Sequence, residues 1–207
     1  MIVLASLNEG KIREFKSLLG PKLLSIFDLD PKFQLPEETG GSYHENAYLK
    51  ARAVAERFKL PSLADDSGFE VEALGGRPGL YSARYGGKEL SFSERIELLL
   101  NEMKNVTDRK AAFVCVLCLV LPESFEPEYF EGRVQGRLLL EARGSMGFGY
   151  DPVFQANSMD KSFAEISEEL KSQISHRAKA IEAANSRIQD LIASAPSAAQ
   201  SGLDHSH

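Results

Sequence analysis

The sequence lacks the features that would direct it to a membrane, to an oxidising compartment or to nucleic acid. Its 207 residues include two cysteines and no tryptophan, and the formal net charge is −6. The longest apolar run, residues 111–121, is too short to cross a bilayer as a helix. No basic segment followed by a long apolar stretch begins the chain, so we expect no signal peptide and a cytoplasmic protein. An acidic chain also lacks the broad basic surface of general nucleic-acid or anionic-membrane binders, so we expect neither partner and only local phosphate binding.

The two cysteines do not indicate a redox or metal site. Cys115 and Cys118 are three residues apart in an apolar run and would point to opposite faces of a strand. A redox Cys-x-x-Cys pair normally begins a helix, and a zinc site needs further ligands. We therefore expect two buried thiols.

The apolar content is sufficient for one large folded unit, because 43% of the residues are hydrophobic. Strands and helices alternate early, whereas neighbouring strands occur later, which predicts an α/β fold with a mixed sheet. Apolar spacing predicts strands at residues 2–5, 23–27, 62–64, 111–121 and 129–139. Capping-box spacings at Ser42/Glu45 and at Ser91/Glu94 each predict a helix start. The small, polar residues 195–207 are expected to form a disordered tail.

The segment from Ser6 to Lys11 is the first candidate phosphate site. It lies between a predicted strand and a predicted helix, where backbone N–H groups attract phosphate and Lys11 adds a positive charge. The G-x-x-x-x-G-K-[ST] pattern of a Walker loop is absent. A capped helix with a surface lysine is an equally good interpretation of this segment.

Asp65-Asp66-Ser67-Gly68 is a candidate catalytic segment, expected at the end of the short strand at 62–64. Ligands and catalytic groups collect at such strand ends in α/β sheets. Adjacent carboxylates repel each other, and Mg²⁺, which prefers hard oxygen ligands, would compensate them. Glu37 or Glu38 could supply a further carboxylate. The alternative is a solvated turn in which Asp caps the backbone.

Residues 147–152, Gly-Phe-Gly-Tyr-Asp-Pro, are a candidate base-binding loop. Glycines on both sides would leave the ring of Phe148 open for a base, and such stacking contributes about 1–3 kcal/mol per base. Pro152 stands where a G-x-G-x-x-G fingerprint needs its last glycine, so the loop is not a dinucleotide motif. A plain aromatic turn is the alternative interpretation.

Three basic residues elsewhere are candidate ligand contacts. Lys50 lies at the border of a helix's apolar face, so its stem can pack while its ammonium group reaches a cleft. Lys171 and Arg177 stand close to the start of the last predicted helix, and Arg177 offers a rigid fork of donors. The neighbouring His176, taken alone, is more typical of a structural hydrogen-bonding residue.

In this order, the segments resemble the inosine triphosphate pyrophosphatase family, the non-standard purine nucleotide pyrophosphatases, over nearly the whole chain before the tail. The segments that carry the resemblance are Ser-Leu-Asn-Glu-Gly-Lys at 6–11, Glu-Glu-Thr-Gly at 37–40, Glu-Asn-Ala-Tyr-Leu-Lys-Ala at 45–51, Ala-Asp-Asp-Ser-Gly at 64–68, Leu-Gly-Gly-Arg-Pro-Gly-Leu-Tyr-Ser-Ala-Arg-Tyr at 74–85, Gly-Phe-Gly-Tyr-Asp-Pro at 147–152 and Ile-Ser-His-Arg at 174–177.

The resemblance implies an elongated two-lobed α/β domain over residues 1–194, a curved mixed sheet, a cleft between the lobes and a homodimer. It implies hydrolysis of purine nucleoside triphosphates such as ITP, dITP and XTP to the monophosphate and pyrophosphate, with Mg²⁺ as cofactor. Asp66 would be the catalytic proton acceptor, and Glu37 with Asp66 would hold the metal. The resemblance favours Glu37 over its neighbour Glu38, which could also serve. The implied substrate contacts are Ser6, Leu7, Asn8, Glu9, Gly10, Lys11, Lys50, Ser67, Phe148, Gly149, Tyr150, Asp151, Lys171, His176 and Arg177.

Two segments depart from the family pattern. Ser145-Met146 replaces two small residues before the Gly-Phe-Gly segment, and Leu7 replaces a residue that is commonly Gly or Asn. These changes affect loop flexibility and leave the charged site residues in place. The rival function is a non-catalytic nucleotide-binding module, which would need the lysines and Phe148 but not the metal-binding carboxylates.

Overall fold

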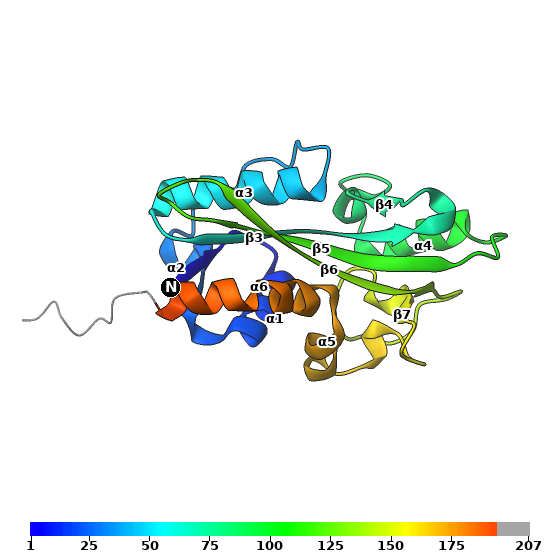
Figure 1. Ribbon diagram of the computed structural model, residues 1–207. Helices are drawn as coiled ribbons and strands as arrows, with labels where there is room; N and C mark the ends of the chain where they lie inside the picture. Colours follow the sequence, from blue (N-terminus) through cyan, green and yellow to red (C-terminus); the bar gives the residue numbers. More distant parts are fainter. Residues whose placement is uncertain (194–207) are drawn as a thin grey trace, which may run out of the picture.

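A single mixed sheet of seven strands runs through the protein in this computed structural model, which describes residues 1–193 (Figure 1). The strand order is β2 (Leu23–Ser25), β1 (Ile2–Leu4), β3 (Ser62–Val71), β5 (Lys110–Val120), β6 (Pro127–Leu138) and β7 (Phe154–Ala156), with the short β4 (Pro78–Gly79) pairing with β3. β1 is parallel to both of its neighbours, and the other pairs are antiparallel. The predicted α/β fold with a mixed sheet is confirmed. The tail predicted at 195–207 lies outside the described residues.

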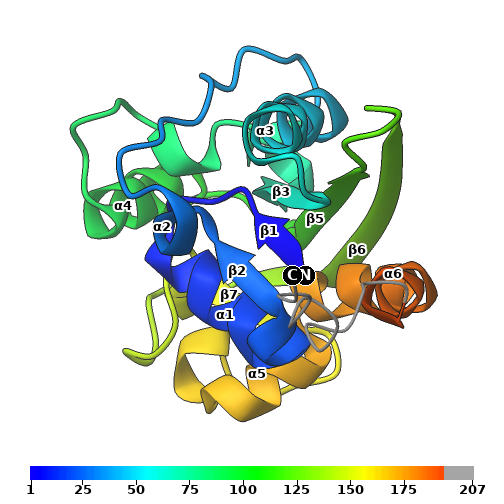
Figure 2. The ribbon, with the colours of Figure 1, turned by 90° about the vertical axis from the view of Figure 1, so that its left-hand side faces the viewer.

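Helices cover both faces of the sheet. They are α1 (Glu9–Leu19), α2 (Ile26–Leu29), α3 (Tyr43–Phe58), α4 (Phe92–Glu102), α5 (Glu168–Ile174) and α6 (His176–Ala193). α3 packs on β3 and β5, whereas α6 packs on β5 and β6 from the opposite side (Figure 2). None of the helices within residues 1–193 is long and apolar enough to span a membrane.

The alternation of side chains along β5 separates two of the three core clusters. Cys115 packs with residues of α1 and α6, whereas Cys118 packs with residues of α3 on the other face. Both thiols are buried, as predicted, and burial raises the pKa of each to about 12. A third cluster, which includes Phe69, Phe113 and Phe154, fills the opposite end of the elongated molecule. The core is therefore divided between the two ends of the sheet.

The predicted helix starts are confirmed by local hydrogen bonds. Ser91 and Glu94 form the reciprocal capping box that opens α4. Ser42 caps α3 by accepting a hydrogen bond from the Glu45 amide at 3.2 Å. The Glu45 carboxylate does not accept the hydrogen bond from the Ser42 amide that would complete a capping box. It accepts instead from the amide of Gly41 at 2.6 Å.

Two strand predictions are wrong in their extent. β3 continues to Val71 because every residue from Ser62 onward pairs with β5, so residues 65–68 lie inside a strand and not in a solvated turn at its end. β1 pairs with β3 only at Ser62 and Leu63, which leaves the β1 side of β3 unpaired until β4 meets Phe69. The strand predicted at 23–27 stops at Ser25, because Ser25 forms a capping box that opens α2.

Candidate functional site

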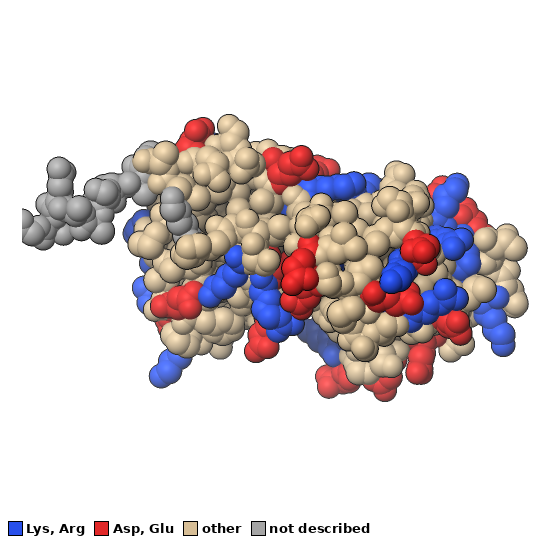
Figure 3. Space-filling model, turned by 90° about the horizontal axis from the view of Figure 1, so that it is seen from below, with Lys and Arg blue, Asp and Glu red and all other residues tan. Residues whose placement is uncertain are grey.

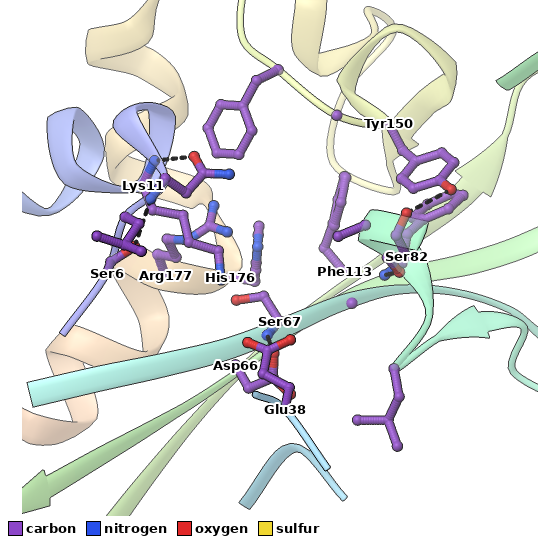
Figure 4. A pocket seen from close by; sticks show the side chains of 18 of the residues that line it. Ser6, Lys11, Glu38, Asp66, Ser67, Ser82, Phe113, Tyr150, His176 and Arg177 are labelled. Atoms are coloured by element: carbon purple, nitrogen blue, oxygen red, sulfur yellow. Dashed lines mark hydrogen bonds between the residues drawn. The ribbon is translucent and has the colours of Figure 1, made fainter. Parts of the chain in front are cut away.

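A cleft of about 370 Å³ lies along the unpaired edge of β3. The end of β1 and the start of α1 form one side, and the start of α6 with the loop before Asp151 lies near them. Figure 4 shows Lys11 and Arg177 on one side of this space, Asp66 on β3, and Tyr150 beyond Ser67 at the other end. The cleft is lined by Ala5, Ser6, Leu7, Asn8, Lys11, Leu35, Pro36, Glu38, Lys50, Asp66, Ser67, Gly68, Phe69, Leu80, Ser82, Ala83, Phe92, Phe113, Phe148, Gly149, Tyr150, Asp151, Lys171, His176 and Arg177.

Most of the predicted site residues come together in this cleft from five separate parts of the chain. The lining includes Ser6, Leu7, Asn8, Lys11, Lys50, Asp66, Ser67, Phe148, Gly149, Tyr150, Asp151, Lys171, His176 and Arg177. Three predicted residues lie outside the lining: Glu9, Gly10 and Glu37. Glu9 and Glu37 are exposed, whereas Glu38 is half-buried and enters the cleft.

Asp66 is held in the cleft by two hydrogen bonds to its carboxylate. The backbone amide of Ser67 donates to Oδ1 at 3.0 Å, and the side-chain amide of Asn46 donates to Oδ2 at 3.0 Å. Burial raises the pKa of Asp66, and the positive charges of Lys50 and Lys11 only partly oppose that effect. The residue is 6% exposed and lines the cleft, so its carboxylate is oriented by protein donors while it still reaches the cleft.

Lys50 connects the loop that carries Glu38 to β3. Its ammonium group reaches the cleft, as predicted from its position on the helix. Its ammonium group donates to Glu38 Oε1 at 2.5 Å and to the carbonyl oxygen of Asp65 at 2.7 Å, and it lies 3.9 Å from Asp66 Oδ1. Burial alone would lower the pKa of Lys50, but the nearby carboxylates raise it above the ordinary value. Arg84 approaches the other oxygen of Glu38 at 3.6 Å. Glu38 is therefore fixed at the cleft by two cations.

Asp65 is a buried anion that contacts two basic residues of the cleft. Its Oδ2 atom pairs with Lys11 at 2.9 Å, accepts from Ser67 Oγ at 2.5 Å and lies 3.5 Å from Nε of Arg177. Although burial opposes ionisation, the neighbouring Lys11 and Arg177 hold the pKa of Asp65 well below its ordinary value. The second oxygen, Oδ1, is buried and has no hydrogen-bond partner among the described residues.

Glu14 fixes Arg177 from the α1 side. The Arg177 Nη1 group donates to Glu14 Oε2 at 2.8 Å, and Ser175 Oγ donates to Glu14 Oε1 at 2.7 Å. Burial would lower the pKa of Arg177, but Glu14 and Asp65 raise it, so the guanidinium remains charged. His176, beside it, is buried and stacks on Phe113 with ring centroids 4.7 Å apart. Burial, aided by neighbouring cations, lowers the pKa of His176 far enough that the imidazole is neutral at pH 7.

The Phe148 loop closes the cleft near these cations. Gly147 and Gly149, on either side of Phe148, have φ values of 74° and 65°, which favour glycine. The Phe148 ring is half-buried, with the Lys171 ammonium 4.6 Å and the Arg177 guanidinium 5.2 Å from its centroid. The ring also packs so close to Gly10 that a Cβ there would lie 2.8 Å from it. The predicted open ring face is thus partly covered by residues of the site itself.

Lys171 and Asp151 form a buried pair that shapes this loop. The Lys171 ammonium donates to Asp151 Oδ2 at 2.6 Å, and the same oxygen accepts from the Phe148 amide at 2.8 Å. Burial raises the pKa of Asp151, and Lys171 opposes that effect. One carboxylate therefore ties the lysine to the backbone that carries the aromatic ring.

The other end of the cleft is apolar. Tyr150 is 2% exposed, stacks on Phe69 with centroids 5.1 Å apart, and donates its hydroxyl hydrogen bond to the Ser82 carbonyl at 3.0 Å. Phe92 completes this wall, in edge contact with Tyr150. The cleft therefore has a charged half, which includes the Phe148 ring beside Lys171 and Arg177, and an apolar half; the phosphates and the ring of one ligand would both find partners in it.

Comparison with known proteins decides the family. The sequence matches the Ham1 family over residues 2–186. The chain belongs to the Ham1 family. It is similar to the dITP/XTP pyrophosphatase of Staphylococcus aureus strain MW2, with 47% identity over 181 residues that cover 87% of this chain and 92% of the relative. The Halalkalibacterium halodurans protein of the same name is 43% identical over 183 residues, covering 86% and 94% of the two chains. The structure of the Staphylococcus aureus Ham1 protein has a TM-score of 0.81 at 45% identity, covering 91% and 98%.

The charged half of this Ham1 cleft has the donor chemistry for a small, hard divalent cation. Asp66 and Glu38 both line the cleft and lie next to each other in Figure 4. Within residues 1–193 no group of three or more His, Cys, Asp or Glu side chains is placed to hold a metal ion. Two carboxylates without a closed cage fit Mg²⁺, which commonly binds one or two carboxylates together with substrate phosphates. The chemistry of the residues therefore fits the cofactor implied by the sequence.

Two polar side chains that hold residues of this Ham1 site in place, Glu14 and Asn46, were not among the predicted ones, although local signals for both exist. Glu14 lies three residues after Lys11, one turn along the same face of α1. Asn46 lies four residues before Lys50 on α3 and is fully buried. A polar side chain one turn from a predicted site lysine, on the buried face of a helix, is the signal that would have found each of them.

Charged side chains of both signs are interspersed on the face seen from below in Figure 3. By contrast, Lys11, Lys50, Lys171 and Arg177 converge in the cleft, each near a carboxylate. Cationic side chains are thus gathered locally, although each is paired with a carboxylate, so the cleft carries charges of both signs.

Proposed function

We propose that this chain is a nucleoside triphosphate pyrophosphatase that converts non-standard purine nucleoside triphosphates, such as ITP, dITP and XTP, to the monophosphate and pyrophosphate. The observation that carries the proposal is one cleft that unites the carboxylates of Asp66 and Glu38, the lysines Lys11 and Lys50, and an aromatic ring beside Arg177. The names of the curated Ham1 relatives support it. Removing such nucleotides keeps them out of DNA and RNA.

In the proposed reaction, the triphosphate binds at the start of α1, where backbone amides and Lys11 attract its charge. Water attacks the α-phosphorus, and Asp66 orients that water or accepts its proton. The bond to the β-phosphate breaks, and pyrophosphate leaves. Lys11 and Lys50 stabilise the negative charge that builds up in the transition state. No covalent nucleophile takes part.

We propose Mg²⁺ as the cofactor, held by Asp66 and Glu38. Of the two adjacent glutamates, Glu38 is preferred over Glu37 because only Glu38 lines the cleft. When bound, Mg²⁺ neutralises charge on the phosphates. Adding excess EDTA should abolish pyrophosphate release, and Mg²⁺ should restore it; turnover that survives EDTA would contradict this assignment.

The base is proposed to stack on Phe148 and to be read by Arg177 and His176. Within residues 1–193 the Arg177 Nη2 group makes no hydrogen bond, so it remains available to donate to the 6-oxo group of hypoxanthine or xanthine. Adenine carries an amino group there, which would leave buried donors unpaired, and such sites can discriminate by as much as about 10⁴. Guanine shares the 6-oxo group, so this contact discriminates only against adenine.

The deciding experiment mixes purified protein, inosine triphosphate and Mg²⁺ and identifies the products. Inosine monophosphate with pyrophosphate is the expected result. Orthophosphate would indicate a different phosphatase, and tight binding without turnover would indicate a nucleotide-binding module. Asp66→Asn should abolish turnover while retaining much of the nucleotide affinity, because loss of a general base typically lowers the rate by about 10²–10⁴.

A second experiment separates base reading from phosphate binding. Arg177→Ala should lower kcat/KM for inosine triphosphate steeply and for ATP little, so that the ratio between them collapses. If both fall together and the ratio survives, Arg177 holds phosphate or structure instead.

We also propose a cytoplasmic homodimer. Light scattering on the purified protein at micromolar concentration tests the assembly, and a monomer mass would contradict it.

A further inference from the structure

Asn46 stands out because it is a fully buried polar side chain that the proposed chemistry does not use. It lies in the first part of α3 and is 0% exposed. Burying an amide is unfavourable unless its donor and acceptor both find partners. Both do, and the two partners belong to the two segments that carry the site's carboxylates.

The donor arm of Asn46 reaches β3. Its Nδ2 group donates to Asp66 Oδ2 at 3.0 Å, between two buried groups. The other Asp66 oxygen is held by the Ser67 amide. These two donors, on opposite oxygens, determine the rotation of the carboxylate plane about the Cβ–Cγ bond.

The acceptor arm of Asn46 reaches the loop that carries Glu38. The Gly40 backbone amide donates to Asn46 Oδ1 at 2.8 Å. The contact is close: a Cβ at residue 40 would lie 2.8 Å from that same oxygen and 2.6 Å from Glu45 Cβ. Only glycine lets the loop pack this tightly against α3, and Glu38 lies two residues earlier along it.

We infer that Asn46 is a positioning residue that sets the spacing and orientation of Asp66 and Glu38 by hydrogen bonding to both segments through one amide. The inference rests on the proposed function, in which these two carboxylates act together. An amide at this position is required because it offers a donor and an acceptor at once. An ionised carboxylate cannot donate to Asp66, and an apolar side chain of similar size can do neither.

The test compares Asn46→Leu and Asn46→Asp with the wild-type protein. Outer-shell partners of metal-binding groups typically contribute 10–100-fold to metal affinity or activity, and we expect a fall in kcat of that size in both variants. KM for inosine triphosphate at saturating Mg²⁺ should stay within about threefold of wild type, because the residues near the base and Lys11 are untouched. In Asn46→Leu the Mg²⁺ concentration for half-maximal rate should rise by about 10–100-fold.

A measurement independent of turnover uses Mn²⁺ as the probe. Electron paramagnetic resonance of free Mn²⁺ is recorded with enzyme and the α,β-methylene analogue of inosine triphosphate, which cannot be cleaved at the reacting bond. Asn46→Leu should weaken Mn²⁺ binding by the same factor as it shifts the Mg²⁺ requirement. Unchanged Mn²⁺ binding would overturn the inference.

Two control variants separate positioning from folding. Val54→Ala removes a fully buried side chain from the same helix and should lower the melting temperature without changing the Mg²⁺ requirement. Asn185→Asp makes the same chemical change as Asn46→Asp at an exposed position of α6 and should change nothing. If Asn46→Leu, like Val54→Ala, lowers the melting temperature without changing the Mg²⁺ requirement, the role of Asn46 is structural and the inference is wrong. If the wild-type protein releases no pyrophosphate, the proposed function is wrong. The inference about Asn46 is then still decided separately, by comparing Mn²⁺ binding of the wild-type protein and Asn46→Leu.

Discussion

Replacing Asp65 with asparagine should destabilise the protein strongly, although Asp65 is not proposed to touch the reacting atoms. Its side chain is 1% exposed and lies against Lys11 and Arg177. Removing one partner of a buried ion pair costs about 3–5 kcal/mol, because the other charge is left uncompensated. Lys11 retains some exposure and Arg177 keeps Glu14 at 2.8 Å, so we expect a loss near the lower end, about 3 kcal/mol.

Thermal unfolding at pH 7 without nucleotide measures this loss. For a chain of this size each 1 kcal/mol shifts the melting temperature by about 2–4 °C, so Asp65→Asn should melt about 6–12 °C lower than wild type. Asp160→Asn, at an exposed position, is the matched control and should melt like wild type. Lys11→Met completes a double-mutant cycle that isolates the coupling between the two charges. A shift below about 2 °C for Asp65→Asn would refute the reasoning, because the buried charge cluster would then contribute nothing to stability.

Three further outcomes follow from the packing. Phe148→Ala should raise KM for all purine triphosphates by a similar factor, corresponding to about 1–3 kcal/mol of lost stacking; an effect on one base only would make Phe148 a specificity residue. Gly132→Ala should destabilise the protein by about 1–3 kcal/mol in urea unfolding, because the new Cβ overlaps the His176 carbonyl at the start of α6; unchanged stability would mean that α6 moves freely on β6. Cys115 and Cys118 should react with a thiol reagent such as DTNB only after unfolding, since burial keeps both protonated and inaccessible; rapid labelling of native protein would contradict their placement.

Local interactions explain why much of the fold could be predicted from the sequence. The starts of α3 and α4 depend on hydrogen bonds between residues three apart, so Ser42 and Ser91 are recognisable without tertiary information. The apolar run at residues 111–121 identifies the buried strand β5. The motifs and their order along the chain were enough to indicate the family. The same motifs named most of the residues that line the cleft, because each motif carries its side chains on a short, rigid element.

Contacts between distant segments decided the rest. β3 extends through the polar residues 65–68 because β5 pairs with all of it, a long-range interaction that local polarity opposes. Glu38 rather than Glu37 enters the cleft because Lys50, twelve residues away on α3, binds it there. Asn46 acquires a role only when β3 and the Glu38 loop meet on either side of its amide. The chain alone specifies which groups are available, whereas their pairing depends on hydrogen bonds and ion pairs that exist only after the sheet and α3 have packed together.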